Sequence, residues 1–190
     1  RTNRTPVTVR IVEGDFMTQD NAKTRVTVLM GGLSSEHDVS LMSGQKAAAA
    51  LAEQYDVTPV VIHRDGLWAL PDGVTVDIFA AIEKLRGADC VFLALHGEFG
   101  EDGRIQGMLD LLGLPYTSSG CAASALAMDK VNSKAVVRAQ GIRVAGHVAL
   151  DRPTWAADRE AVLEAVIEGV GCPCVVKSSA LGSSVVMAIP

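Results

Sequence analysis

The chain has 190 residues, of which 48% are hydrophobic and only 4% aromatic, and its formal net charge is -5. This hydrophobic fraction allows a well-packed aliphatic core and excludes an intrinsically disordered chain. The negative charge argues against binding to nucleic acid or to a membrane surface, and no apolar run approaches the ~20 residues of a membrane span.

Residues 1–24 are mixed and polar, without the apolar segment of a signal peptide. We interpret them as a tail or a remnant of an expression vector, with a natural start near Met17. An additional strand at residues 7–12 is the alternative interpretation.

The core fold is expected to begin with the apolar run 26–30, a buried strand that ends in the turn Gly31-Gly32. A helix is predicted over residues 38–53, with Ser35 as its N-cap. The next expected elements are a strand at 57–62, a small hairpin or loop at 63–73, a helix at 76–86, a strand at 90–95, and a helix at 104–112 closed by Gly113.

Two further helices are predicted at 121–128 and 129–139, the second with Asp129 as its N-cap. A helix at 155–167 and strands at 174–177 and 185–189 then begin a second unit. We therefore divide the chain into an N-terminal domain, residues 25–120, and the start of a second domain, residues 121–190.

Strands and helices alternate, and the strands are continuous apolar runs rather than alternating patterns. Both features are typical of an α/β fold with a parallel, Rossmann-like sheet covered by helices on both faces. Ligands of such sheets bind at the carboxyl ends of the strands, where Gly31-Gly32 and His96-Gly97 are both expected.

Two segments at that edge are candidate substrate sites. In the first, a glycine turn precedes a helix start that carries Glu36; the arrangement suits ligand binding, but an acid is also favoured there by the helix dipole. In the second, His96 leaves a buried strand and is followed by glycines and acids. An ordinary turn with a hydrogen-bonded histidine is the alternative.

Two lysines are candidate phosphate ligands. Lys130 stands at a helix start, where a cation is electrostatically disfavoured unless an anion binds nearby; an ordinary surface lysine is the alternative. Lys177 ends a buried strand and precedes a Ser/Gly loop at 178–184, whose amides and hydroxyls suit phosphate oxygens. A flexible hairpin tip would give the same pattern.

The four cysteines lack the spacing of a redox or zinc motif. We interpret Cys90, Cys121, Cys172 and Cys174 as buried free thiols of a protein in a reducing cytoplasm.

Six motifs follow one another in order: LMGGLSSEHDVSL at 29–41, VFLALHG at 91–97, GEDGRIQGML at 100–109, GLPYTSSG at 113–120, ASALAMDK at 123–130 and VVKSSALGSS at 175–184. Together they resemble the D-alanine–D-alanine ligase family of the ATP-grasp superfamily. The resemblance implies a pre-ATP-grasp N-terminal domain followed by the beginning of an ATP-grasp domain.

The resemblance also implies roles for single residues. Glu36 would hold the ammonium of the first D-alanine, and His96 would lie near its carboxylate. Lys130 and Lys177 would bind ATP phosphates, and Gly182, Ser183 and Ser184 would clamp the γ-phosphate, with Ser183 also acting near Glu36. The implied enzyme is a cytoplasmic homodimer, joined through its N-terminal domain, that uses ATP and Mg²⁺ to form D-Ala-D-Ala for peptidoglycan.

Three residues depart from the family pattern: Ser178 stands where proline is usual, Leu181 where a polar residue is common, and Val186 where glycine is usual. The family's adenine pocket and metal ligands are expected outside this chain, so no metal ligand is assigned here and the chain alone is expected to be inactive. The alternatives are a D-Ala–D-lactate or D-Ala–D-Ser ligase, a non-catalytic binding fragment, and a Rossmann-type nucleotide-binding module. Absence of the G-x-G-x-x-G pattern counts against the last.

Overall fold

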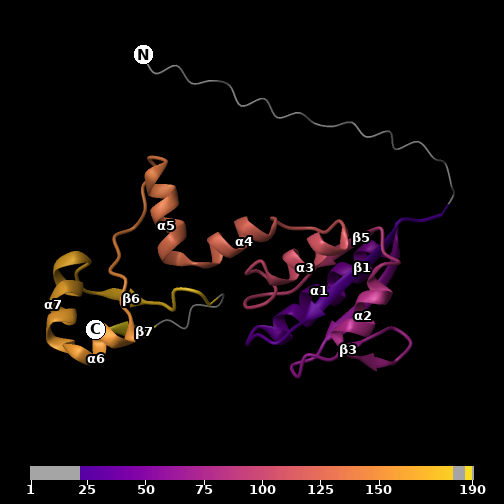
Figure 1. Ribbon diagram of the computed structural model, residues 1–190, viewed down its shortest axis with the longest axis horizontal. Coiled ribbons are helices and arrows are strands. Elements are labelled where there is room, and N and C mark those ends of the chain that lie inside the picture. The colour runs from indigo at the N-terminus through magenta and orange to yellow at the C-terminus, as the bar shows by residue number, and fades with distance from the viewer. Residues whose placement is uncertain (1–21, 182–186, 190) are drawn as a thin grey trace, which may run out of the picture.

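The computed structural model describes residues 22–181 and 187–189. In chain order its elements are β1 (Arg25–Gly31), α1 (His37–Leu51), β2 (Asp56–Ile62), β3 (Trp68–Ala69), β4 (Thr75–Val76), α2 (Ile78–Leu85), β5 (Cys90–Leu93), α3 (Arg104–Leu112), α4 (Cys121–Met128), α5 (Lys130–Ala139), α6 (Arg152–Ala157), α7 (Arg159–Gly169), β6 (Cys174–Val176) and β7 (Met187–Ile189). A five-stranded sheet with its helices forms one lobe, and a two-stranded sheet with α6 and α7 lies in another (Figure 1). The α/β fold class predicted from the sequence is confirmed.

The five-stranded sheet has the order β4-β3-β2-β1-β5. Strand β1 lies between β2 and β5 and is parallel to both, as the apolar runs predict. Strands β3 and β4 add an antiparallel edge, which continues the predicted hairpin to Val76. The prediction of a helix from residue 76 was therefore wrong at its start. Asp77 is the reason, because its carboxylate accepts a hydrogen bond from the Ala80 amide at 2.9 Å and caps the helix there.

Helices cover both faces of this sheet, and each face has its own core. On one face α2 and α3 pack over Leu29, Val60 and Val91. On the other, α1 packs over Val28 and Met30. Full burial of one such aliphatic side chain stabilises the fold by about 1.5–3 kcal/mol. The two cores hold the carboxyl ends of β1 and β5 in a fixed relation.

The start of α1 differs from the prediction. Ser35 is not the N-cap: Glu36 occupies that position and makes no side-chain capping hydrogen bond. Ser34 is used instead, since its Oγ accepts from the Glu36 amide at 3.2 Å and donates to the His96 carbonyl at 2.7 Å. The Glu36 carboxylate is thus left available for another contact.

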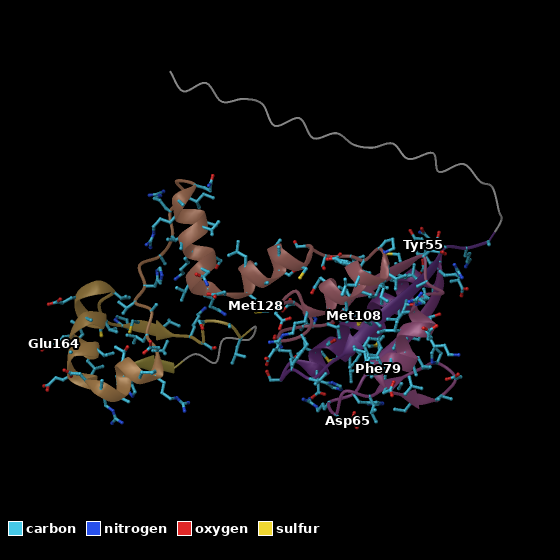
Figure 2. All side chains as sticks on the ribbon, in the orientation of Figure 1. Tyr55, Asp65, Phe79, Met108, Met128 and Glu164 are labelled. Carbon is cyan, nitrogen blue, oxygen red and sulfur yellow. The ribbon has the colours of Figure 1, made fainter. Side chains whose placement is uncertain are left out.

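The second half of the chain is mostly helical and opens with α4 and α5. Met128 lies at the turn between these helices, away from the five-stranded sheet (Figure 2). Asp129 caps α5 as predicted, accepting from the amides of Val131 and Asn132 at 3.0 Å each. The helix predicted at 155–167 is two helices, because Asp158 accepts from the Ala161 amide at 3.0 Å and starts α7 afresh.

The small sheet pairs β6 and β7 in antiparallel register. Both strands were predicted. The predicted range was one residue longer than the observed strand for β6 and two residues longer for β7. Residues 185 and 186, residues 1–21 of the expected tail at 1–24, and the alternative strand at 7–12 lie outside the described residues.

The cysteines are free, as expected, but none is fully buried. Cys172 is exposed and the other three are partly exposed. Partial burial raises the pKa of the Cys90 thiol. Among the described residues, no helix is long and apolar enough to cross a bilayer.

Candidate functional site

Two glycines at the end of β1 form the floor of the candidate site. Gly31 and Gly32 have φ angles of +87° and +96°, a region that glycine adopts without strain. The Gly32 amide donates to the Ile62 carbonyl at 2.7 Å, and a Cβ on Gly31 would collide with that same carbonyl oxygen. Only glycine therefore allows the chain to turn this closely over the end of β2.

Glu36 lies directly against the backbone of Gly97. A Cβ on Gly97, whose φ is +69°, would stand 2.5 Å from Glu36 Oε2. The bond from Ser34 Oγ to the His96 carbonyl holds the same two segments together. Two motifs about sixty residues apart in the sequence thus meet at one edge of the sheet, as their positions after β1 and β5 predict.

Buried side chains of α1 lock this arrangement from below. Ser40, which is 0% exposed, donates from Oγ to the Ala94 carbonyl at 2.7 Å and accepts from the Gly31 amide at 2.8 Å. His37 Nδ1 lies 2.6 Å from the Gly32 carbonyl oxygen, so Nδ1 carries the proton and donates. The glycine turn is therefore fixed to α1 on one side and to β2 on the other.

The His96 ring has a partner on each nitrogen. Nε2 lies 2.9 Å from Ser43 Oγ of α1, and Nδ1 lies 3.9 Å from Glu101 Oε1. The other oxygen of Glu101 accepts from the Gly97 amide at 2.7 Å. The ring side chain is 33% exposed, so one edge of it remains open to a ligand.

A cavity of about 380 Å³ opens beside the glycine turn, between α2 and α3. Its walls are mainly apolar and include Trp68, Ile78, Phe99 and Met108, with His96 on the rim. Phe99 has φ +67°, which is costly for an aromatic residue. Asp102 compensates by accepting from the Phe99 amide at 2.8 Å, so the segment after His96 is held in one conformation.

The lysine at the start of α5 contacts the segment that follows β6. The Lys130 amide donates to the Ser179 carbonyl at 2.8 Å, and its Nζ donates to the Leu181 carbonyl at 2.6 Å. Lys177 directly follows β6 and is exposed. Lys130 therefore lies against the residues that precede Gly182, while Gly182, Ser183 and Ser184 themselves lie outside the described residues.

Comparison with known families decides what these motifs belong to. A family profile described as D-ala D-ala ligase N-terminus matches residues 25–81 and 73–119, together half of the 190 residues. A second profile, D-ala D-ala ligase C-terminus, matches residues 136–189. The chain belongs to the D-alanine–D-alanine ligase family.

Individual relatives agree with this assignment. The D-alanine–D-alanine ligase of Chlorobium limicola is 37% identical over 86% of this chain, and that of Geobacter sulfurreducens is 43% identical over 91%. The chain spans about half the length of these relatives, 54% and 49% respectively.

Solved structures of the same class are similar in fold. The D-alanine-D-alanine ligase from Coxiella burnetii superposes with a TM-score of 0.68 at 28% identity, over 88% of this chain and 55% of that one. The VanG D-Ala:D-Ser ligase from Enterococcus faecalis superposes with a TM-score of 0.67 at 27% identity, over 85% of this chain and 53% of that one. The family predicted from the sequence motifs is confirmed.

The chain offers two lysines, a side-chain type that binds phosphate, at the segment that follows β6. Lys130 and Lys177 bring two cationic side chains to the segment around β6, and Lys130 is already fixed beside the predicted Ser/Gly loop. Across residues 22–181 and 187–189, no three His, Cys, Asp or Glu side chains gather as a metal site would require. The expectation that metal ligands lie outside this chain stays a prediction.

Sequence reasoning missed three residues that contact the candidate site: His37, Ser40 and Ser43. The signal was present, since Glu36, Ser40 and Ser43 are spaced i, i+4 and i+7 and share one face of α1. This spacing shows that the polar residues share one face of a largely exposed helix, but not which strand that face meets.

Proposed function

We propose that this chain supplies the first-substrate half of an ATP-dependent D-alanine–D-alanine ligase, which forms the D-Ala-D-Ala dipeptide for peptidoglycan through an acyl-phosphate intermediate. The family, and relatives that carry this name at 37–43% identity, support the proposal. We further propose that the enzyme acts in the cytoplasm as a homodimer joined through its N-terminal domain, residues 25–120, with the ATP-grasp domain beginning at residue 121.

The contact between Glu36 and Gly97 carries the proposal. An N-cap serine, threonine or aspartate normally turns its side-chain oxygen to the helix amides, but Glu36 makes no such bond and lies over Gly97 instead. A carboxylate in this position can hold a substrate ammonium by a charge-assisted hydrogen bond. The ring of His96, the residue before Gly97, would then lie near the substrate carboxylate.

ATP supplies the phosphoryl group that activates the substrate carboxylate, and Mg²⁺ neutralises phosphate charge when it is bound. From this chain, Lys130 and Lys177 would bind the ATP phosphates. Gly182, Ser183 and Ser184 would close over the γ-phosphate, with Ser183 near the Glu36 side of the site. The hydrogen bond from Lys130 to the Leu181 carbonyl supports this role, because it already joins one lysine to the base of that loop.

Substitution of Glu36 by glutamine in the complete enzyme tests the proposal. The Glu36→Gln change removes one charge-assisted hydrogen bond, worth about 1.5–3 kcal/mol, so the KM for the first D-alanine should rise about tenfold or more. Glu53→Gln, an exposed change just after the same helix, is the matched control. An unchanged KM in Glu36→Gln, with the control also unchanged, would remove Glu36 from the substrate site.

A D-Ala–D-Ser ligase is the second candidate, because the VanG D-Ala:D-Ser ligase superposes almost as well as the Coxiella burnetii enzyme. A D-Ala–D-lactate ligase shares the same first-substrate motifs. Product analysis distinguishes the three ligases. The enzyme is given D-alanine alone, or D-alanine with an equal concentration of D-serine or of D-lactate, and the dipeptide or depsipeptide formed is identified. We expect D-Ala-D-Ala to dominate.

A further inference from the structure

The two partners of the His96 ring, Ser43 and Glu101, have no role of their own in the proposed function. Ser43 lies in the interior of α1, 53 residues before His96, and contacts Nε2 at 2.9 Å. Glu101 lies five residues after His96, in the loop that leads to α3, and faces Nδ1 at 3.9 Å. The ring thus has a hydroxyl next to Nε2 and a carboxylate facing Nδ1.

The carboxylate of Glu101 favours the tautomer of a neutral imidazole in which the proton is on the nitrogen that faces it. A carboxylate only accepts hydrogen bonds, so the nitrogen that faces it must be the donor. One oxygen of Glu101 is fixed by the Gly97 amide at 2.7 Å, which keeps the other oxygen turned toward Nδ1. A separation of 3.9 Å is longer than a direct hydrogen bond, and ligand-free sites commonly tighten such contacts only when substrate binds.

With the proton on Nδ1, Nε2 is an acceptor and the Ser43 hydroxyl is its donor. Ser43 Oγ also lies 3.0 Å from Val39 O and 3.2 Å from Ser40 O, and its single hydroxyl hydrogen can serve only one acceptor at a time. In the Nδ1–H tautomer that hydrogen goes to Nε2, and in the Nε2–H tautomer it goes to a helix carbonyl. The order serine, histidine, acid resembles that of a nucleophilic triad. Here, however, the hydroxyl lies against its own helix rather than toward a ligand.

We propose that Ser43 and Glu101 are positioning residues for His96: they fix the orientation and the Nδ1–H tautomer of its ring beside Glu36 in the D-alanine site. The inference rests on the proposed function for the identity of the ligand, but the ring contacts themselves do not. Without Ser43 or Glu101 the imidazole can rotate about its Cβ–Cγ bond, and its exposed edge then no longer meets the substrate in one geometry.

Nitrogen NMR of the histidine side chains in the 190-residue chain tests the tautomer without any enzyme assay. The chain has four histidines, and His96→Gln identifies the His96 signals by their loss. We expect the neutral ring to have a protonated Nδ1 and an unprotonated Nε2. Ser43→Ala should shift the Nε2 signal, and Ser43→Thr, which keeps the hydroxyl, should restore it.

Glu101→Gln gives the sharper result, because glutamine has one acceptor and one donor. Since the Gly97 amide needs the acceptor, the amide nitrogen would face Nδ1, and the ring proton should move to Nε2. Glu98→Gln in the same loop is the matched control and should leave both nitrogens unchanged. A His96 tautomer that is the same in wild type, Ser43→Ala and Glu101→Gln would overturn the proposal.

A double-mutant cycle in the complete enzyme tests whether the two residues act through His96. Ser43→Ala and Glu101→Gln should each lower kcat/KM for the first D-alanine roughly three- to tenfold, the range of one hydrogen bond, with the KM for ATP unchanged. In a His96→Gln background the same changes should have no further effect.

Full additive losses in the His96→Gln background would overturn the positioning role, because a purely structural effect does not depend on the ring. If wild-type complete enzyme shows no D-alanine-dependent activity, the proposed function fails, and the NMR result alone then decides whether Ser43 and Glu101 fix the ring.

Discussion

At the scale of single residues, Ser40 links the two strand ends on which the site depends. Its hydroxyl is fully buried and joins the Gly31 amide to the Ala94 carbonyl, at the ends of β1 and β5. Backbone groups buried without a partner are costly, and here one small side chain satisfies both a donor and an acceptor. Ser40 therefore keeps the Glu36 and His96 segments in contact although it touches neither side chain.

We expect Ser40→Ala to destabilise the first lobe by about 1–3 kcal/mol for each buried group that loses its partner. Urea unfolding followed by Trp68 fluorescence measures this, in a Trp155→Phe background, because Trp68 is buried in the same core. Ser35→Ala, an exposed change two residues from the start of α1, is the control and should unfold at the wild-type midpoint. Equal midpoints for Ser40→Ala and the control would show that the two backbone groups do not depend on Ser40.

At the scale of elements, the sequence predicts those helices and strands whose signals lie within a single segment of the chain. The strands β1, β2 and β5 and the helix α3 were predicted because continuous apolar runs and glycine stops are visible in one segment at a time. The break at Asp158 was missed, since a helical apolar pattern continues across it and only the capping bond reveals the new start.

The contacts of Ser43 and Ser40 were missed for a different reason. Their partners, His96 and Ala94, lie more than fifty residues away, and nothing within α1 indicates which strand its polar face will meet. The meeting of Glu36 with the His96-Gly97 turn was predictable, because parallel strands bring their carboxyl ends to one edge of the sheet.

The amino-terminal ends of β1 and β5, far from the candidate site, are joined by an ion pair between Arg25 and Asp89. Its contribution to the free energy of unfolding depends on pH. Arg25 donates to both carboxylate oxygens of Asp89, from Nη2 at 2.8 Å and from Nε at 3.2 Å, and its amide adds a third bond at 2.8 Å. These bonds lower the pKa of Asp89 to about 2, from the usual value of about 3.9.

Because the folded pKa of Asp89 is depressed, its stabilising contribution is complete above about pH 4 and is lost as the pH falls toward 2. The free energy of unfolding should therefore be higher for wild type than for Asp89→Asn at pH 5, and this difference should shrink as the pH falls from about 4 to about 2 and vanish only below that. Urea unfolding at intervals between these values measures it. A difference that stays constant over the whole range would show that the carboxylate charge is not what stabilises the pair.

At the scale of the whole molecule, the two lobes have different degrees of burial. The buried apolar side chains lie almost entirely in the first lobe, and Val162 is the one buried apolar residue that α4 to α7 contribute among the described residues. Helices α4 and α5 lead from the first lobe to the second (Figure 1). Lys130, at the start of α5, donates hydrogen bonds to the segment that follows β6. These bonds connect the second lobe to the helices that link it to the first lobe.

The 190-residue chain alone should show no D-alanine-dependent ligase activity. It corresponds to 49–54% of the length of its relatives, and the family resemblance assigns the adenine pocket and the metal ligands to the remaining part. Phosphoryl transfer needs carboxylate oxygens beside the γ-phosphate, about 2.0–2.1 Å from each Mg²⁺, and lysines alone cannot hold that ion.

Glu36 and His96 of the short chain should still hold D-alanine weakly, so added D-alanine should perturb the NMR signals of the Glu36 and Gly97 amides. Ligase activity is a separate measurement. Phosphate release from ATP and D-alanine, measured beside the complete Geobacter sulfurreducens ligase, tests the prediction. Turnover by the short chain at a rate near that of the complete ligase would mean that the metal site is formed by these 190 residues.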